Sequence, residues 1–286
     1  MRVLVVTAVD AERDAVVRGA TALGSMPSGG AGESAEPVAP AEPVELAVPG
    51  FVLRRPAPGP EPLVIDALAA GVGPAAAAAG AATALAAAAL SGSPYGLVVS
   101  AGIGGGFTTP GRSAAVGSVV VSDAIVAADL GAETPEGFVP VTDLGFGTVE
   151  HRPPAALVRA VAEAAGAQRG DVLTVSTVTG TAERAAALVA ARPAALAEAM
   201  EGFGVAEAAA AHGVPVLEIR AVSNPVGPRD RAAWRIGDAL EALSGASAAL
   251  RAALRAAPPE TWGSSSDTCG SSPACGTRET RSTSES

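Results

Sequence analysis

The segment Leu97-Val-Val-Ser-Ala-Gly-Ile-Gly-Gly-Gly-Phe107 decides the fold class of this chain. Residues 97–100 form a short apolar, β-branched run that is typical of a buried strand, and glycines follow it at once. An Ala-rich stretch at residues 74–90, which favours a helix, precedes the run. A helix, a buried strand and a glycine-rich loop in this order predict an α/β fold, in which ligands bind where strands end, and these glycines would let a ligand approach the backbone closely.

The same alternation extends in both directions from this segment. Further strands are predicted at residues 3–6, 63–68, 118–121, 172–177 and 214–223, and helices at 10–17, 154–165, 181–190, 204–212 and 228–256. Pro228 suits a first helical position and would place Ile236, Leu240 and Leu243 on one face of the last helix. These elements predict a buried, mostly parallel sheet.

Two segments of low complexity stand apart from this pattern. Residues 23–62 are rich in Gly, Ser, Pro, Ala and Glu and are interpreted as an insertion around one strand near residues 45–53. Residues 257–286 turn to Ser, Thr, Gly and Pro and are predicted to be a disordered tail, because they carry too little apolar surface to offset chain entropy. We therefore expect one domain over residues 1–256.

The composition excludes several classes of protein. All 19 basic residues are Arg, so the chain has no Lys for a Schiff base or a P-loop. With two His, and two Cys in the tail, we expect no metal bound by His or Cys. A net charge of -10 and 3% aromatic residues argue against nucleic-acid binding. The N-terminal apolar run is too short for a signal peptide and residues 75–90 are short for a membrane span, so we expect a cytoplasmic protein.

Polar residues follow several of the predicted strands. Asp10 suits a helix N-cap after the first strand, which puts Glu12 in the first helical turn, where the helix dipole favours an ionised carboxylate able to act as a general base. Glu201 offers a second carboxylate just before a helix. Asn224 ends a strand, held extended by Pro225. Each residue also has a plain structural interpretation, as a helix-start acid or a turn residue.

In this order and spacing, the motifs resemble the nucleoside phosphorylase and hydrolase superfamily, especially the 5′-methylthioadenosine/S-adenosylhomocysteine nucleosidases and, within the superfamily, the futalosine hydrolases. The resemblance implies a three-layer sandwich with a central twisted, mixed sheet, no cofactor, and a homo-oligomer. It assigns Glu12 to the acid/base glutamate that activates water. It places Ile103, Gly104 and Gly105 in the loop beside the base and ribose.

The resemblance also assigns residues to the two ends of a bound nucleoside. Thr177, Val178 and Thr179 match a segment that lines the purine with backbone groups. Met200 and Glu201 match a pair that packs beneath the ribose and binds its hydroxyls.

One position departs from the adenine-specific pattern. The family's strand-ending Arg-Ala-x-Ser-Asp reads Arg220-Ala-Val-Ser-Asn224 here. An Asn amide can donate to O6 of a 6-oxopurine while its carbonyl accepts the proton that N7 gains, and mispairing costs ~1–3 kcal/mol. The resemblance thus implies hydrolysis of futalosine to hypoxanthine and dehypoxanthine futalosine, in menaquinone biosynthesis, with an adenine-releasing nucleosidase of methylthioadenosine or aminofutalosine as an alternative.

Two further interpretations stay open. Asp10, Glu12 and Asp14 would repel the phosphate that a phosphorylase needs, but Arg13 and Arg112 remain available to bind it. A second glycine motif at residues 71–76 approximates a dinucleotide fingerprint and allows an NAD-dependent oxidoreductase, although Gly71 and Gly73 are better explained by close helix packing. A non-catalytic nucleoside-binding protein is the remaining class. Residues 134–146 are the segment suspected of completing a neighbouring subunit's site.

Overall fold

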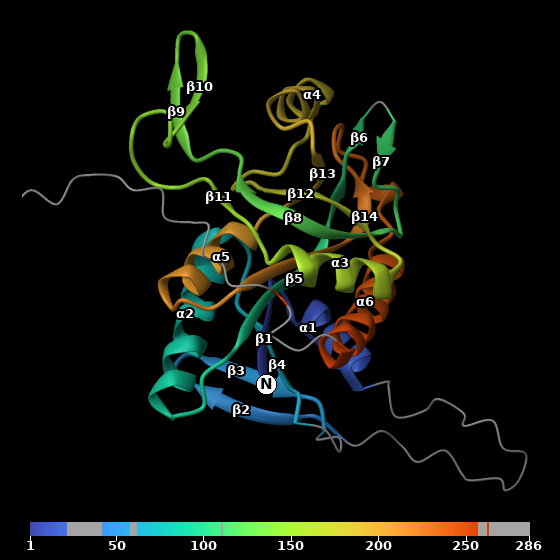
Figure 1. The fold of residues 1–286 in the computed structure, drawn as a ribbon. Helices are drawn as coiled ribbons and strands as arrows, with labels where there is room; N and C mark the ends of the chain where they lie inside the picture. Colours follow the sequence, from blue (N-terminus) through green and yellow to red (C-terminus); the bar gives the residue numbers. More distant parts are fainter. Residues whose placement is uncertain (22–41, 58–61, 110, 257–261, 263–286) are drawn as a thin grey trace, which may run out of the picture.

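The computed structural model describes residues 1–21, 42–57, 62–109, 111–256 and 262 of the chain. Its centre is a ten-stranded mixed sheet with helices on both faces (Figure 1). The predicted α/β architecture is therefore confirmed.

Four parallel strands form the middle of the sheet. They are β4 (Val64–Ala69), β1 (Arg2–Thr7), β5 (Leu97–Gly106) and β14 (Val216–Pro225), in this spatial order. Both faces are covered, so the strands read as continuous apolar runs rather than alternating ones. Because the strands are parallel, their carboxyl ends lie at one edge, where the site forms.

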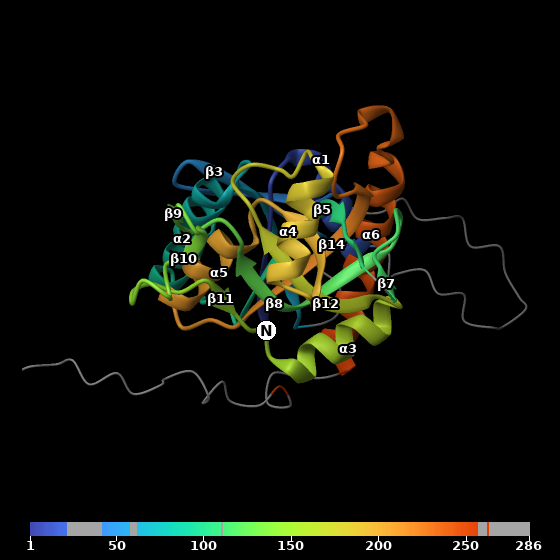
Figure 2. The ribbon, with the colours of Figure 1, turned by 90° about the horizontal axis from the view of Figure 1, so that it is seen from above.

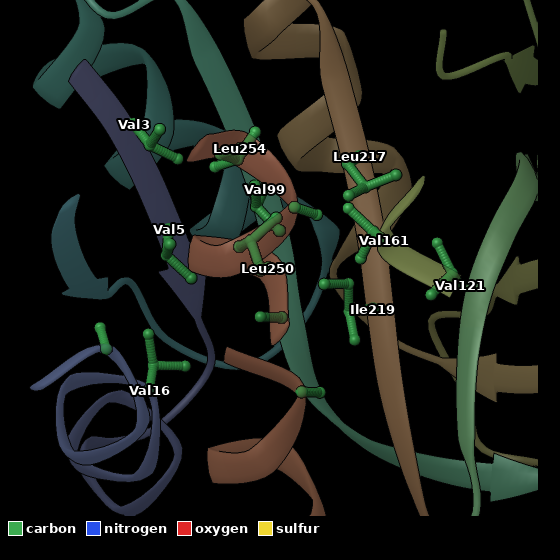
Figure 3. Packing of buried hydrophobic residues seen from close by; sticks show 14 of the residues in the cluster. Val3, Val5, Val16, Val99, Val121, Val161, Leu217, Ile219, Leu250 and Leu254 are labelled. Carbon is green, nitrogen blue, oxygen red and sulfur yellow. The ribbon is translucent and has the colours of Figure 1, made fainter. Parts of the chain in front are cut away.

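The helices divide between the two faces of the sheet (Figures 1 and 2). One face carries α1 (Asp10–Thr21), α3 (Ala155–Ala165) and α6 (Ile236–Ala256). The other carries α2 (Pro74–Leu90) and α5 (Gly202–Ala211). Figure 3 shows the first layer, in which Val16 of α1 and Leu250 of α6 approach the valines of β1 and β5.

Half of the sheet closes on itself, which the sequence did not indicate. Strands β8 (Val119–Ala127), β12 (Gln168–Thr174) and β13 (Ala195–Ala199) join β5 and β14 in a ring of five. β13 is not predicted from the sequence, because Ala-Leu-Ala-Glu-Ala has no β-branched residue and favours a helix. Helix α4 (Ala182–Ala191) packs outside this ring through Leu188.

The edges of the sheet correct the interpretation of residues 23–62. The described residues of this segment contain two strands rather than one, β2 (Val44–Val48) and β3 (Phe51–Arg55), joined by a turn in which Gly50 has a φ of 77°. β3 pairs with β4, so the hairpin extends the sheet. Residues 22–41 and 58–61 lie outside the described part of the chain. The other strands are short: β6 (Thr108–Thr109), β7 (Arg112–Ser113), β9 (Gly131–Thr134), β10 (Gly137–Pro140) and β11 (Glu150–His151).

The last helix starts later than predicted. It begins at Ile236 rather than Pro228, and residues 228–235 form a loop with one 3-10 turn. Gly227 has a φ of 139°, and the backbone N–H of Arg235 donates to the Ser223 carbonyl, so the chain turns back over the strand end before the helix starts. Ile236 is 44% exposed and does not share the buried face with Leu243.

One residue of the predicted disordered tail is part of the core. The indole of Trp262 is buried and packs with the α1, α3 and α6 layer. The other residues of 257–286 lie outside the described part of the chain. Among the helices that the structure describes, none has the length and apolar character to cross a membrane.

Candidate active site

A cavity of about 610 Å³ opens at the carboxyl edge of the parallel strands. This size is within the range of small-molecule sites. Nine of the ten predicted site residues line it: Glu12, Ile103, Gly104, Gly105, Val178, Thr179, Met200, Glu201 and Asn224. The tenth, Thr177, is exposed and lies outside the lining, so its predicted contact with the purine is not supported.

Glu12 lies at the floor of this cavity and is buried. Its Oε2 accepts from the backbone N–H groups of Ala8 (3.0 Å) and Val9 (3.2 Å), and its Oε1 accepts from that of Ile103 (2.9 Å). We expected the helix dipole to favour the ionised form, but burial dominates and raises the pKa of Glu12, against these hydrogen bonds and the charge of Arg220. A raised pKa makes its carboxylate a stronger base.

The glycines after Leu97 do not form the predicted loop. They continue β5 to Gly106, without positive φ, and make room for the protein's own groups. A β-carbon at Gly102 would lie 2.6 Å from Arg220 Nη1 and 2.8 Å from Glu12 Oε1. One at Gly104 would lie 2.7 Å from the Glu198 carbonyl oxygen. The absence of side chains therefore lets two charged side chains and a neighbouring strand approach β5.

A buried arginine joins the carboxylates of the site. Arg220 donates through Nε to Glu218 (2.9 Å), through Nη1 to Glu201 (3.2 Å) and through Nη2 to Ser100 (2.8 Å), and it is 1% exposed. Burial raises the pKa of Glu218 to about 7 despite the arginine. The sequence indicates Arg220 only as part of a motif and does not single out Glu218. Their spacing of two residues, which puts both on one face of a strand, was the available signal.

Glu201 links the glycine motif at residues 71–76 to the buried Arg220. Its Oε1 accepts from the backbone N–H of Gly73 (3.2 Å), and its Oε2 accepts from that of Met200 (3.3 Å) and from Arg220. A carboxylate offers about four acceptor positions, so Glu201 retains capacity for a ligand hydroxyl.

The rival dinucleotide motif has another explanation in the structure. Gly71 and Gly73 have φ of 107° and 94°, so both serve a turn. A β-carbon at Gly71 would also lie 3.1 Å from Ala76 Cβ of α2, in line with the predicted helix packing, whereas no atom lies within 4 Å of one at Gly73. Helix packing is closer still at Gly204, where a side chain would meet the Pro74 carbonyl. Because Glu201 accepts from the backbone N–H of Gly73, a carboxylate of the protein already occupies the N-terminus of this helix, where a dinucleotide would place its phosphates.

A third buried carboxylate, Glu198, lines the cavity and was missed. It sits on β13, the strand that the sequence analysis also missed. Its Oε1 accepts from the backbone N–H of Thr179 (2.8 Å), and its Oε2 accepts from the hydroxyl of the same residue. The Thr179 N–H is thus engaged by Glu198 rather than free for a base. Burial raises the pKa of Glu198.

Asn224 reaches the cavity because β14 is irregular at this point. Val222 pairs with Gly104 and Asn224 with Gly105, so Ser223 is an extra residue that redirects the side chains after it. The Ser223 hydroxyl donates to Asn224 Oδ1 (2.8 Å), and Nδ2 donates to the Pro225 carbonyl (3.0 Å).

Neither Arg13 nor Arg112, the two arginines predicted to be available for a phosphate, lines this cavity. Arg13 pairs with Asp10 (2.8 Å) and Asp14 (3.0 Å). Arg112 donates to the carbonyl of Arg169. Within the described residues, the arginines in the lining are Arg229 and Arg231 of the loop before α6.

Comparison with known proteins agrees with this geometry. The profile of the phosphorylase superfamily matches residues 63–257. A futalosine hydrolase of Streptomyces coelicolor (strain ATCC BAA-471 / A3(2) / M145) is 62% identical over 262 residues, which cover 92% of this chain and 98% of that protein. A futalosine hydrolase of Acidothermus cellulolyticus (strain ATCC 43068 / DSM 8971 / 11B) is 42% identical, over 87% of this chain and 90% of that protein.

Solved structures show the same fold at low identity. A methylthioadenosine/S-adenosylhomocysteine nucleosidase of Colwellia psychrerythraea 34H, in complex with adenine, has a TM-score of 0.69 at 19% identity and covers 89% of this chain and 96% of its own. A futalosine hydrolase of Helicobacter pylori strain 26695 has a TM-score of 0.65 at 16% identity, with coverage of 90% and 97%. By the superfamily profile and the relative that matches along nearly its whole length, this chain belongs to the phosphorylase superfamily and, within it, to the futalosine hydrolases.

Proposed function

We propose that this chain hydrolyses the N-glycosidic bond of futalosine and releases hypoxanthine and dehypoxanthine futalosine, as a step of menaquinone biosynthesis. The observation that carries the proposal is the buried Glu12 carboxyl in the cavity, with its pKa raised by burial and with Glu201 and Arg220 beside it. The substrate is taken from the names of the relatives.

In the proposed reaction, the bond between C1′ and N9 breaks, its electron pair goes to the purine, and N7 takes a proton from solvent, which regains one when Glu12 releases the proton that it takes from the attacking water. A water oxygen bonds to the ribosyl C1′, and Glu12 accepts the proton that this water loses. Glu201 holds the ribose hydroxyls with its remaining acceptor capacity.

Asn224 is the group proposed to recognise the base. Its Oδ1 already accepts from Ser223, which directs Nδ2 away from that hydroxyl. When hypoxanthine is bound, Nδ2 exchanges its bond to the Pro225 carbonyl for one to O6, and Oδ1 accepts from the proton on N7. The adenine-releasing alternative places an amino group at the position of O6, where it faces the Nδ2 donor.

Hydrolysis is favoured over phosphorolysis by the arginines. Arg13 and Arg112 are engaged elsewhere, and the two arginines that line the cavity are exposed, whereas its buried part carries the carboxylates of Glu12, Glu198 and Glu201. These acids disfavour a phosphate dianion beneath the ribose.

Chromatography of the released base tests the proposal. Futalosine should yield hypoxanthine in phosphate-free buffer, at a rate that added phosphate does not raise, and Glu12→Gln should slow the release at least ~100-fold. Release only with phosphate would identify a phosphorylase, and adenine from aminofutalosine or methylthioadenosine in preference would identify the alternative nucleosidase. A nicotinamide-dependent absorbance change would support an oxidoreductase.

We also propose that the chain acts in the cytoplasm, where this nucleoside intermediate would arise, as a homo-oligomer. The β9–β10 hairpin and the turn after it project from the body of the molecule (Figure 1) and expose Phe138, Leu144 and Phe146, the last by 62%. No residue of 134–146 lines the cavity of its own chain, so this segment would contribute only to a neighbour. Light scattering should give a mass above the 27.6 kDa of one chain, and Phe146→Ser should lower the measured mass.

A further inference from the structure

Glu198 is a buried carboxylate of the cavity to which the proposed reaction gives no task. It lies on β13, is 6% exposed and lines the cavity. β13 pairs with one edge of β5, which sets Glu198 beside Gly105, and β14 pairs with the other edge, which sets Asn224 beside the same glycine. Gly105 also lines the cavity and has no side chain to fill it. Glu198 and Asn224 therefore flank one open position of the cavity wall.

This position is separate from the group proposed to activate water. Glu12 accepts from the backbone N–H of Ile103, which lies two residues before Gly105 on β5. Two residues of an extended strand span about 7 Å, so Glu12 and Gly105 lie beside different parts of a bound nucleoside. Because Asn224 is proposed to bind the purine, Glu198 belongs to the purine end of the cavity.

The Glu198 carboxylate presents acceptors at a place where the backbone would otherwise present a donor. Its two oxygens accept from the backbone N–H (2.8 Å) and from the hydroxyl of Thr179, so this N–H is not available to a ligand. A carboxylate offers about four acceptor positions, of which Thr179 uses two. A ligand group on this side of the cavity therefore meets acceptors, and it must itself donate.

The two candidate bases differ in this property. Along one edge of a purine, N7 is followed by the substituent at C6 and then by N1. N1 of hypoxanthine carries a hydrogen and donates, whereas N1 of adenine has a lone pair and accepts. When Asn224 binds N7 and O6, N1 is the next atom of the same edge, and Glu198 is the hydrogen-bonding side chain on the opposite side of Gly105.

We propose that Glu198 is a specificity-determining residue, whose carboxylate accepts a hydrogen bond from N1–H of a 6-oxopurine and repels the N1 lone pair of a 6-aminopurine. The identity of the base rests on the proposed function. The contact is distinct from the one assigned to Asn224, because Glu198 reads N1 whereas Asn224 reads N7 and O6.

Calorimetric titration of the wild type with three free bases tests the contact at N1. Hypoxanthine has the N1 hydrogen, 1-methylhypoxanthine lacks it but keeps O6 and N7, and adenine has an acceptor at N1. Both 1-methylhypoxanthine and adenine should bind at least ~10-fold more weakly than hypoxanthine, because each leaves a buried carboxylate mispaired. Equal affinity for hypoxanthine and 1-methylhypoxanthine would overturn the proposal.

Glu198→Gln separates hydrogen bonding from the size of the side chain. The backbone N–H of Thr179 retains the amide oxygen of the glutamine, so its NH2 group replaces the other carboxylate oxygen and opposes N1–H. Hypoxanthine should bind at least ~10-fold more weakly than to the wild type. Adenine should bind no more weakly, and 1-methylhypoxanthine should stay within ~2-fold. An equal loss of affinity for all three bases would assign Glu198 to holding Thr179 and overturn its role in reading the base.

Asp171 provides the matched control. It lies on β12, which pairs with β13, it is 7% exposed, and burial raises its pKa as it raises the pKa of Glu198. It does not line the cavity. Asp171→Asn should leave the ratios of the three affinities within ~2-fold of the wild type. A shift as large as that of Glu198→Gln would show that the effect does not come from contact with the base.

The kinetic test uses nucleosides. Glu198→Gln should lower kcat/KM for futalosine at least ~10-fold relative to kcat/KM for aminofutalosine. An unchanged ratio, in an enzyme that releases hypoxanthine, would refute the contact at N1 and leave the proposed function standing. A wild type that releases no hypoxanthine from futalosine would refute the proposed function instead, and the titrations with free bases would still decide whether Glu198 selects a base that donates from N1.

Discussion

Replacing Gly102 with Ala should damage both the stability and the activity of the enzyme. The new methyl carbon would lie 2.6 Å from Arg220 Nη1 and 2.8 Å from Glu12 Oε1, whereas ordinary contact begins at 3.4 Å. Neither group can move freely, because Arg220 holds three hydrogen bonds and Glu12 accepts three more. The added carbon must therefore break at least one buried charge-assisted bond.

The expected cost is ~1–3 kcal/mol in the free energy of unfolding, as for other overpacked cores. A displacement of Glu12 by ~1 Å should also lower kcat/KM by ~100-fold. Urea denaturation and hypoxanthine release measure the two effects. Gly96→Ala is the control, since its nearest neighbour would be Met1 Cγ at 3.6 Å, and it should stay within ~0.5 kcal/mol of the wild type. Similar behaviour of the two variants would refute the idea that β5 is glycine-rich to admit Arg220 and Glu12.

Four other changes have defined outcomes. Glu12→Gln should lower kcat by at least ~100-fold while substrate still binds in equilibrium titration, and near-normal turnover would remove it from the mechanism. Asn224→Asp should shift the ratio of kcat/KM for futalosine and aminofutalosine by ~1–3 kcal/mol toward the latter; an unchanged ratio would mean that this side chain does not read the base. Burial raises the pKa of Glu218 from 4.5 to about 7, so its ionisation opposes folding. As the pH rises through this interval, the wild type should therefore lose stability relative to Glu218→Gln in urea denaturation. The same difference in stability between the two proteins at pH 5 and pH 8 would contradict this. A chain that ends at Ala256 should have a lower free energy of unfolding than one that ends after Trp262, by up to ~3–5 kcal/mol, because it lacks the buried indole. Equal melting temperatures of the two chains would contradict this.

Local sequence determined the elements with strong patterns. The β-branched run at β1 and the Ala-rich stretch of α2 carry their secondary structure in their own composition, and α2 begins at Pro74 as predicted. Glu12, Glu201 and Asn224 could be found because each lies next to the end of a predicted strand or the start of a helix, and in a parallel sheet those ends meet at one edge.

Tertiary structure alone decided what these residues contact. β13 is a strand only because β5 and β12 pair with it on either side, so no local signal marked it or Glu198. The pKa of Glu12 follows from burial beneath elements distant in sequence, which outweighs the helix dipole that the sequence suggested. Trp262 packs against the core although its neighbours in sequence have a low-complexity composition. Hydrogen bonds within one segment, such as those of a helix, can be predicted from the sequence of that segment. Burial and strand pairing cannot, because they depend on segments that only the fold brings together.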